Sequence, residues 1–230
     1  MISTGSKALD TLLGGGVRTG MMTDVYGQAG SGKSQLCFTL CANCAKNGGT
    51  AIFVDTAGTF RPERIVEISG SSGALDRITF VRALNTYDQE NAVKKIAEIV
   101  PQLVVVDSVT SLFSAEYSGP ARHLAVMKHL HELGLAAINV DCAVVVTNMV
   151  RNIPQTTVDQ SGRNIAQTNI SSRQREYLGS SVSIYSHIKI KLEIVNLARS
   201  LFQATLIQPA DKQQQHVPFT ITTRGISDIS

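Results

Sequence analysis

Residues 27–34 decide the fold of this chain, and they run Gly27-Gln28-Ala29-Gly30-Ser31-Gly32-Lys33-Ser34. Their spacing satisfies Gly-x-x-x-x-Gly-Lys-Ser/Thr, after a predicted strand at 23–26 and at the start of a predicted helix at 34–45. Glycine lets such a loop turn its backbone N–H groups inward, and the positive end of the helix adds to the attraction for phosphate. All eight residues are therefore predicted to bind the phosphates of ATP, with the Lys33 ammonium reaching the β- and γ-phosphates.

A second stretch, Leu103-Val104-Val105-Val106-Asp107, supports the first one. It is continuously apolar, as expected of a central parallel strand, and it ends in a carboxylate at the edge where such sheets bind ligands. Hydroxyl and carboxylate oxygens are suitable ligands for Mg²⁺. Ser34 and Asp107 are therefore the predicted magnesium site.

Apolar runs alternate with helical patterns along the first 150 residues. The predicted strands are 23–26, 50–55, 77–82, 103–107 and 143–147, and the predicted helices are 34–45, 62–68, 88–99 and 121–139. This alternation indicates an α/β fold with a mostly parallel sheet flanked by helices, as in P-loop NTPase cores. After a polar stretch at 151–177, alternation returns in 184–192, 201–207 and 217–222, which we expect to close the sheet as antiparallel strands. No boundary interrupts the pattern, so residues 1–230 are predicted to form a single domain.

The composition limits the classes of partner. The net charge is only +3 and aromatic residues make up 5%, so any nucleic-acid surface must be local and cannot depend mainly on aromatic stacking. Cys37, Cys41 and Cys44 share one face of the predicted helix and are expected to be buried thiols, not metal ligands. No signal peptide and no apolar run of about twenty residues is evident, which predicts a cytoplasmic protein without a membrane partner.

Further stretches occur in a characteristic order: Ser3-Thr4-Gly5-Ser6-Lys7-Ala8-Leu9-Asp10, Thr56-Ala57-Gly58-Thr59-Phe60-Arg61-Pro62-Glu63-Arg64, Asp107-Ser108-Val109-Thr110-Ser111 and Val146-Thr147-Asn148. Together with the phosphate loop they resemble the RecA/RadA recombinase family, densely over residues 1–150 and loosely beyond. Within that family the chain is similar to an archaeal RadA/RadB-like paralogue reduced to the core domain. The resemblance implies a RecA-type ATPase fold that uses ATP and Mg²⁺ and forms filaments on single-stranded DNA. It also implies that Arg64 stacks on the adenine.

Four features depart from the family pattern. Ala57 stands where active members carry the glutamate that activates the attacking water, and a methyl group cannot accept a proton. Met149 replaces the glutamine that senses the γ-phosphate, and a thioether cannot donate a hydrogen bond. The stretch 208–213 keeps the family's ATP-capping segment poorly, and these 230 residues offer no counterpart of the N-terminal DNA-binding domain. The resemblance therefore implies a mediator with weak or no ATP hydrolysis.

A basic loop is the predicted DNA contact. The resemblance puts the family's second DNA loop at 151–177, which holds Arg151, Arg163, Arg173 and Arg175, and leaves Arg122 near a shortened first loop. Cations on a flexible loop suit phosphate contacts, although a solvated loop without a ligand has the same composition. The predicted partners are single-stranded DNA and a full-length RadA-type recombinase or another paralogue. His123, His129 and His131 are expected at the surface or at helix ends.

Two alternatives stay open. One is an active DNA-dependent recombinase in which another carboxylate, such as Glu63 or Asp55, replaces the missing base. The other is a KaiC-like signalling ATPase that acts on protein partners and has no affinity for DNA.

Overall fold

The computed structural model describes residues 1–153, 156–158, 164–166, 173–209 and 215–229, and its side-chain description leaves aside residues 152–174. The α-helices are α1 (Lys7–Leu12), α2 (Lys33–Lys46), α3 (Pro62–Ser69), α4 (Thr86–Ile99), α5 (Ser111–Glu116), α6 (Gly119–Asn139) and α7 (Gly179–Tyr185). The strands are β1 (Met22–Gly27), β2 (Ala51–Asp55), β3 (Ile78–Arg82), β4 (Leu103–Asp107), β5 (Ala143–Ile153), β6 (Thr156–Val158), β7 (Asn164–Ala166), β8 (Arg173–Glu176), β9 (Ile188–Asn196), β10 (Leu201–Gln208), β11 (His216–Thr222) and β12 (Gly225–Ser227).

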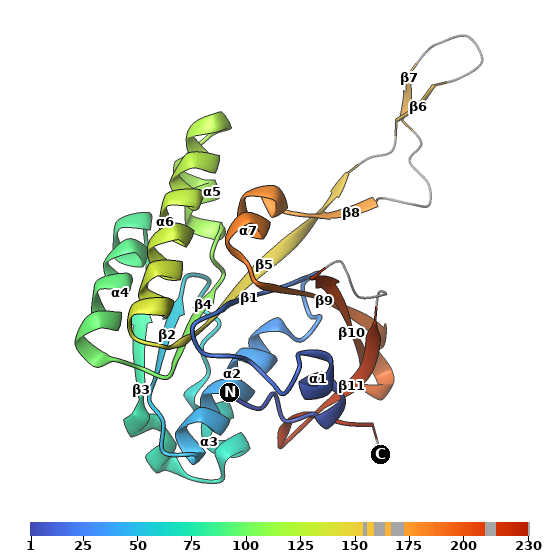
Figure 1. The fold of residues 1–230 in the computed structure, drawn as a ribbon. Coiled ribbons are helices and arrows are strands. Elements are labelled where there is room, and N and C mark those ends of the chain that lie inside the picture. The colour runs from blue at the N-terminus through green and yellow to red at the C-terminus, as the bar shows by residue number, and fades with distance from the viewer. Residues whose placement is uncertain (154–155, 159–163, 167–172, 210–214, 230) are drawn as a thin grey trace.

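The main sheet has the order β12-β11-β10-β9-β1-β5-β4-β2-β3 (Figure 1). Every neighbouring pair from β3 across to β9 is parallel, and the pairs from β9 to β12 are antiparallel. The mostly parallel α/β sheet with antiparallel strands at its C-terminal side is therefore confirmed. Because β1, β4 and β5 are adjacent and parallel, their carboxyl ends meet at one edge, where ligands bind in such sheets.

Helices cover both faces of the sheet (Figure 1). Val105 and Val145 belong to the core shared with α1, α2 and α3, whereas Val104 and Val144 belong to the core shared with α4, α5 and α6. The alternation places successive valines on opposite faces, so a continuously apolar run is what this position in the sheet requires. Cys37, Cys41 and Cys44 are buried in the first core, as the helical spacing predicted, and burial raises the pKa of the Cys44 thiol to about 11.

Local signals fix the helix ends. The side chain of Asn85 accepts a hydrogen bond from the backbone of Asp88 at 2.8 Å and caps α4. Pro62 starts α3, and Gly70 ends it with a positive φ of 73°. At the other end of the chain, the Asp228 carboxylate accepts from the Ser6 hydroxyl at 2.5 Å and from the first backbone N–H groups of α1.

The structure corrects several expectations beyond Val150. The predicted strand 184–192 begins instead as the end of α7, because Val182 packs into the core as a helical residue, and β9 then runs parallel to β1. The predicted loop 151–177 contains strands: β5 continues to Ile153 and pairs antiparallel with β8, so that Arg151 lies opposite Arg175. We call the antiparallel pair of Val150–Ile153, at the end of β5, with β8 the ribbon.

Two further corrections concern α6. The helix begins at Gly119, so Arg122 lies in a first helical turn where the sequence suggested the remnant of a loop. His129 is fully buried, not at the surface, and it packs beside Phe113. Its ring lies 3.1 Å from the side-chain amide of Gln89, and burial lowers its pKa to about 4. Within the described residues, each helix is too short or too polar to cross a lipid bilayer.

Candidate nucleotide site and basic cleft

The loop 27–34 joins the end of β1 to the start of α2. Gly30 and Gly32 have positive φ angles of 78° and 96°, which glycine adopts without the steric cost that other residues incur. Gly27 also has no room for a side chain, because a Cβ atom there would lie 2.2 Å from the carbonyl oxygen of Leu192. The glycines are therefore required by the backbone path that opens the helix N-terminus toward the loop.

Polar groups of the loop lie around the N-terminus of α2. The Lys33 ammonium donates to the carbonyl oxygens of Gly27 and Gln28, at 2.8 Å each. Burial lowers the pKa of Lys33, against the opposing effect of the Asp107 carboxylate. The Ser31 hydroxyl is buried and has no hydrogen-bond partner among the described residues. An unsatisfied donor beside a lysine and a helix N-terminus fits a phosphate group, which would accept from all three.

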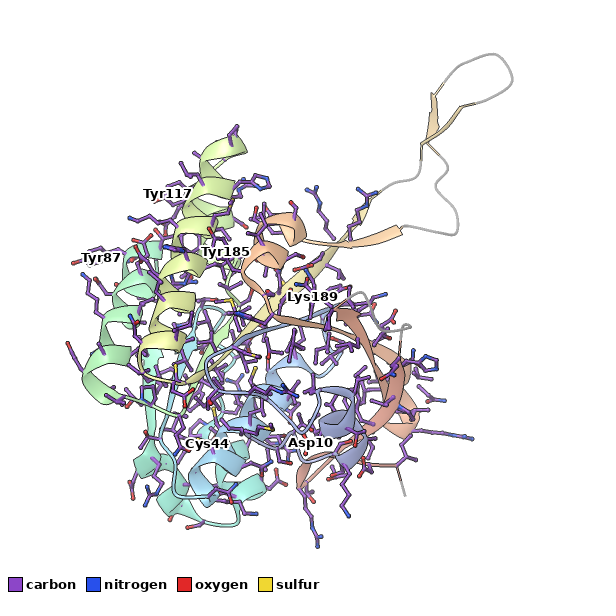
Figure 2. The ribbon with its side chains drawn as sticks, in the orientation of Figure 1. Asp10, Cys44, Tyr87, Tyr117, Tyr185 and Lys189 are labelled. Atoms are coloured by element: carbon purple, nitrogen blue, oxygen red, sulfur yellow. The ribbon has the colours of Figure 1, made fainter. Side chains whose placement is uncertain are left out.

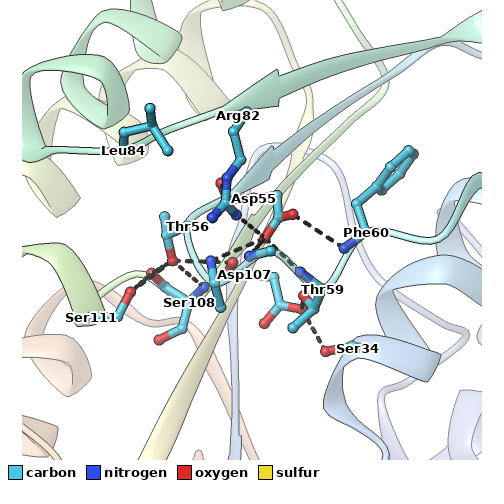
Figure 3. Close-up of polar contacts among 12 residues, drawn as sticks. Ser34, Asp55, Thr56, Thr59, Phe60, Arg82, Leu84, Asp107, Ser108 and Ser111 are labelled. Atoms are coloured by element: carbon cyan, nitrogen blue, oxygen red, sulfur yellow. Dashed lines mark hydrogen bonds and ion pairs between the residues drawn. The ribbon is translucent and has the colours of Figure 1, made fainter.

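The residues expected to hold magnesium lie in direct contact (Figure 3). The Ser34 hydroxyl donates to one carboxylate oxygen of Asp107 at 2.6 Å, and the Thr59 hydroxyl approaches the same oxygen at 3.3 Å. The second carboxylate oxygen accepts from Thr147. Asp107 is 4% exposed. A buried carboxylate beside a hydroxyl, at the edge of the phosphate loop, fits the oxygen ligands that Mg²⁺ prefers.

Asp55 is engaged by the backbone of the loop that follows β2. Its carboxylate accepts from the backbone N–H groups of Ala57, Gly58 and Thr59 at 3.0, 2.8 and 3.1 Å. It also accepts from Phe60, and Arg82 lies 3.2 Å away as an ion-pair partner (Figure 3). These contacts shape the 56–60 loop and occupy the oxygens that a general base would need.

Arg64 lies on α3 and is held by several acceptors. Its Nε donates to Gln35 of α2 at 2.9 Å, and its terminal nitrogens donate to Glu67 and to the carbonyl oxygens of Thr222 and Thr223. The guanidinium therefore links α3 to the turn between β11 and β12. Stacking of Arg64 on an adenine stays a prediction.

Three of the predicted arginines converge on a basic cleft. Arg122 from α6 and Arg151 and Arg175 from the ribbon line a cavity of about 430 Å³ together with Tyr177. Arg122 donates to the Tyr177 hydroxyl at 2.5 Å, and its guanidinium carbon lies 5.9 Å from the centre of the tyrosine ring. The corresponding carbon of Arg151 lies 5.6 Å from the same centre. Such cation–π contacts hold both guanidinium groups near one aromatic ring, which concentrates positive charge in the cleft.

The comparison with known protein families agrees with this geometry. A family model described as Rad51 matches residues 1–229. The chain belongs to the Rad51 family.

Curated relatives of this Rad51-family chain include two archaeal proteins and a plant protein. The DNA repair and recombination protein RadA of Metallosphaera sedula is 42% identical over 173 residues, covering 66% of this chain and 53% of that protein. RadA of Ignicoccus hospitalis is 42% identical over 177 residues, covering 66% and 54%. The DNA repair protein RAD51 homolog B of Zea mays is 39% identical over 168 residues, covering 65% and 49%. The chain thus spans about half the length of the curated relatives it matches.

The structure brings some of the predicted site residues together but not all of them. Loop 27–34 and Asp107 form one site, and Ala57 is exposed close to it. Met149 is 49% exposed at the start of the ribbon. Arg173 lies in β8, where only its backbone is described, and Arg163 falls outside the described residues.

Sequence reasoning missed Tyr177 and a buried ion cluster beneath the cleft. The cluster joins Lys189 of β9 to Asp24 of β1 and to Glu176 of β8. A signal for it was present, because Lys189 lies within the run Ile188-Lys189-Ile190 of a strand that is buried on both faces. A lysine at such a position requires a buried partner.

Proposed function

We propose that this chain binds ATP and Mg²⁺ at loop 27–34 and acts in DNA recombination and repair as a RadB-like mediator with slow or no hydrolysis. The observation that carries the proposal is a complete phosphate loop together with an exposed methyl group at Ala57, in the segment whose Thr59 hydroxyl contacts Asp107. The Asp55 carboxylate, at the start of that segment, is engaged by four backbone N–H groups. We therefore expect this chain to bind ATP without hydrolysing it efficiently.

The binding roles follow from the contacts. Lys33 would exchange the carbonyls of Gly27 and Gln28 for phosphate oxygens, and Ser31 would donate its free hydroxyl. Ser34 and Asp107 would hold Mg²⁺, which neutralises charge on the β- and γ-phosphates when bound. A methyl group at Ala57 cannot orient an attacking water, and the Asp55 carboxylate two residues away is engaged by the backbone, so we expect the bound ATP to persist.

The basic cleft is the proposed site for single-stranded DNA. Arg122, Arg151 and Arg175 supply three positive charges to one cavity, while the neighbouring Glu176 is neutralised by Lys189. Guanidinium groups bind phosphate in a fork geometry, and such contacts act on any sequence. Tyr177 offers a ring on which a base would stack.

A full-length RadA-type recombinase is the proposed protein partner. Strand β3 ends the sheet, with β2 as its only neighbour in the described chain. Around this edge, Phe80 is 45% exposed, and Leu84 and Tyr87 are each 69% exposed. An open edge bordered by large apolar side chains suits an extended segment of another chain. Calorimetry with a RadA should show binding to the parent that Tyr87→Glu weakens.

Single-turnover hydrolysis with and without single-stranded DNA tests the central claim. We expect ATP to be bound, with turnover slower by about 10² to 10⁴ than in a competent recombinase. Turnover at the rate of a recombinase would establish the active-enzyme alternative instead. ATP binding without any DNA affinity at low salt would favour a signalling ATPase of the KaiC kind.

A further inference from the structure

The buried ion cluster connects β1, the strand that leads into the phosphate loop, to the C-terminal end of β8. The Lys189 ammonium lies 3.2 Å from the carboxylate of Asp24 and in direct contact with that of Glu176. It also donates to the Ser183 hydroxyl of α7 at 2.6 Å. The side chains of Asp24, Glu176 and Lys189 are 0, 8 and 5% exposed. Figure 2 shows Lys189 between α7 and the central sheet, below the ribbon.

Asn148 connects this cluster to the segment that follows β4. Its amide nitrogen donates to Glu176 at 2.7 Å and to the carbonyl of Tyr177 at 2.6 Å. Its amide oxygen accepts from Thr110 at 2.7 Å and from the backbone of Met149 at 2.9 Å. The amide thus makes four hydrogen bonds, and it joins the segment after β4 to β8.

The cluster borders the basic cleft, because Glu176 lines the cavity between Arg175 and Tyr177. A shift of β8 along β5 would move both of them relative to Arg122. An ion pair buried at this place contributes little net stability compared with apolar side chains, but it permits one arrangement of its partners.

We propose that Glu176 and Lys189 are positioning residues that lock the ribbon, and with it the arginine cleft, in its binding arrangement whether or not nucleotide is present. The inference rests on the proposed DNA site and adds to it how that site is regulated. The thioether of Met149 cannot donate a hydrogen bond to a phosphate, so the contacts that hold the ribbon come from the cluster and from Asn148.

Hydrogen exchange tests the lock without DNA. The backbone N–H of Tyr177 donates to the carbonyl of Met149 at 2.8 Å and reports on the foot of the ribbon. In the parent, protection of this amide should be the same with and without ATP and Mg²⁺. In Glu176→Gln and in Lys189→Met, exchange of this amide should be at least about tenfold faster.

The double variant Glu176→Gln/Lys189→Met separates positioning from folding. Each single variant leaves a charge buried without its partner and should lower the unfolding temperature, whereas the double variant should recover most of that loss. If the pair positions the cleft, the double variant should still bind a fluorescent single-stranded oligonucleotide about tenfold more weakly at low salt. Lys191→Met removes the same charge from the same strand at a half-exposed pair with Glu193 and should leave affinity unchanged.

The outcomes are distinct. Recovery of DNA affinity together with stability in the double variant would reduce the cluster to a folding element and overturn the inference. A large effect of ATP on Tyr177 exchange or on DNA affinity in the parent would also overturn it. A parent that fails to bind DNA would remove the proposed DNA site, while the exchange experiment would still decide whether the lock exists.

Discussion

The phosphate loop and the basic cleft are built in opposite ways. The loop takes eight consecutive residues, and its shape follows from three glycines between a strand and a helix. The cleft takes Arg122 from α6 and Arg151 and Arg175 from paired strands, and it depends on Lys189 beneath them. A site encoded locally tolerates change elsewhere, whereas a site assembled from distant segments depends on whatever fixes their register.

Lys33→Ala should produce the largest effect, because it acts within the local site. It removes the cation that faces the β- and γ-phosphates, and affinity for ATP should fall on the order of 100-fold. Calorimetric titration with ATP and Mg²⁺ measures this directly. Lys46→Ala, at the exposed end of the same helix, removes an equal charge and should bind as the parent does. Equal affinity of the Lys33 variant would contradict the phosphate-site prediction.

Removing the three cleft arginines should weaken DNA without affecting ATP. In the triple variant Arg122→Ala/Arg151→Ala/Arg175→Ala, affinity for unrelated single strands should fall tenfold to a hundredfold, and the slope of log affinity against log salt by about two. Fluorescence anisotropy at several salt concentrations gives both quantities. A matched triple replacement of the exposed Arg77, Arg199 and Arg224 controls for net charge. Equal losses in the two triple variants would mean that the cleft has no special role.

The same contrast explains what the sequence could predict. The loop, the central strands and the contact between Ser34 and Asp107 follow from local spacing and from the parallel sheet, and they were predicted. The ribbon was not, because 151–177 is polar and has no apolar alternation that would predict paired strands. The helical start of 179–185 was missed because Val182 and Ile184 alternate as strand residues do, and only tertiary packing selects the helix.

Ala57→Glu tests whether a general base is the only group that the nucleotide site lacks for ATP hydrolysis. The exposed position can accept the longer side chain, and a carboxylate there would orient water. A general base supplies a factor of about 10² to 10⁴ in rate. Because Met149 and the poorly kept capping stretch 208–213 remain, we expect turnover to rise by only about tenfold. Ala57→Gln has the same shape without the basic oxygen and should stay at the parent rate. A full recovery would show that the residue at 149 has no part in hydrolysis, and equal rates for Glu and Gln would mean that the carboxylate is not the missing element.

The smallest effect concerns Asp24, which sits beneath the cleft and belongs to the strand that leads into the phosphate loop. Burial raises the pKa of this carboxyl group well above its ordinary value, the charge of Glu176 adds to the increase, and Lys189 opposes it. The folded protein therefore holds the proton to a higher pH than the unfolded chain does. The stability from this group is complete below the unfolded pKa of about 3.9 and is lost as the pH rises through the folded value. Asp228 is the opposite case, since hydrogen bonds from Ser6 and from the start of α1 lower its pKa.

Asp24→Asn should therefore flatten the loss of stability that the parent shows as the pH rises above about 4, because an amide has no proton to lose. Below that pH the free energy of unfolding should change by only about 1 kcal/mol or less, since asparagine resembles the protonated carboxyl group, and at pH 7 the variant should be the more stable protein. Asp228→Asn should instead flatten the acid side, where the parent loses stability as the pH falls. Urea unfolding at a series of pH values measures both curves. If Asp24→Asn lost several kcal/mol at pH 7, Asp24 would be ionised in the fold, and Lys189 would then be paired with two charges instead of one. Such a loss would contradict the raised pKa of Asp24, whereas a gain in relative stability with rising pH would leave Glu176 as the ionised partner of Lys189.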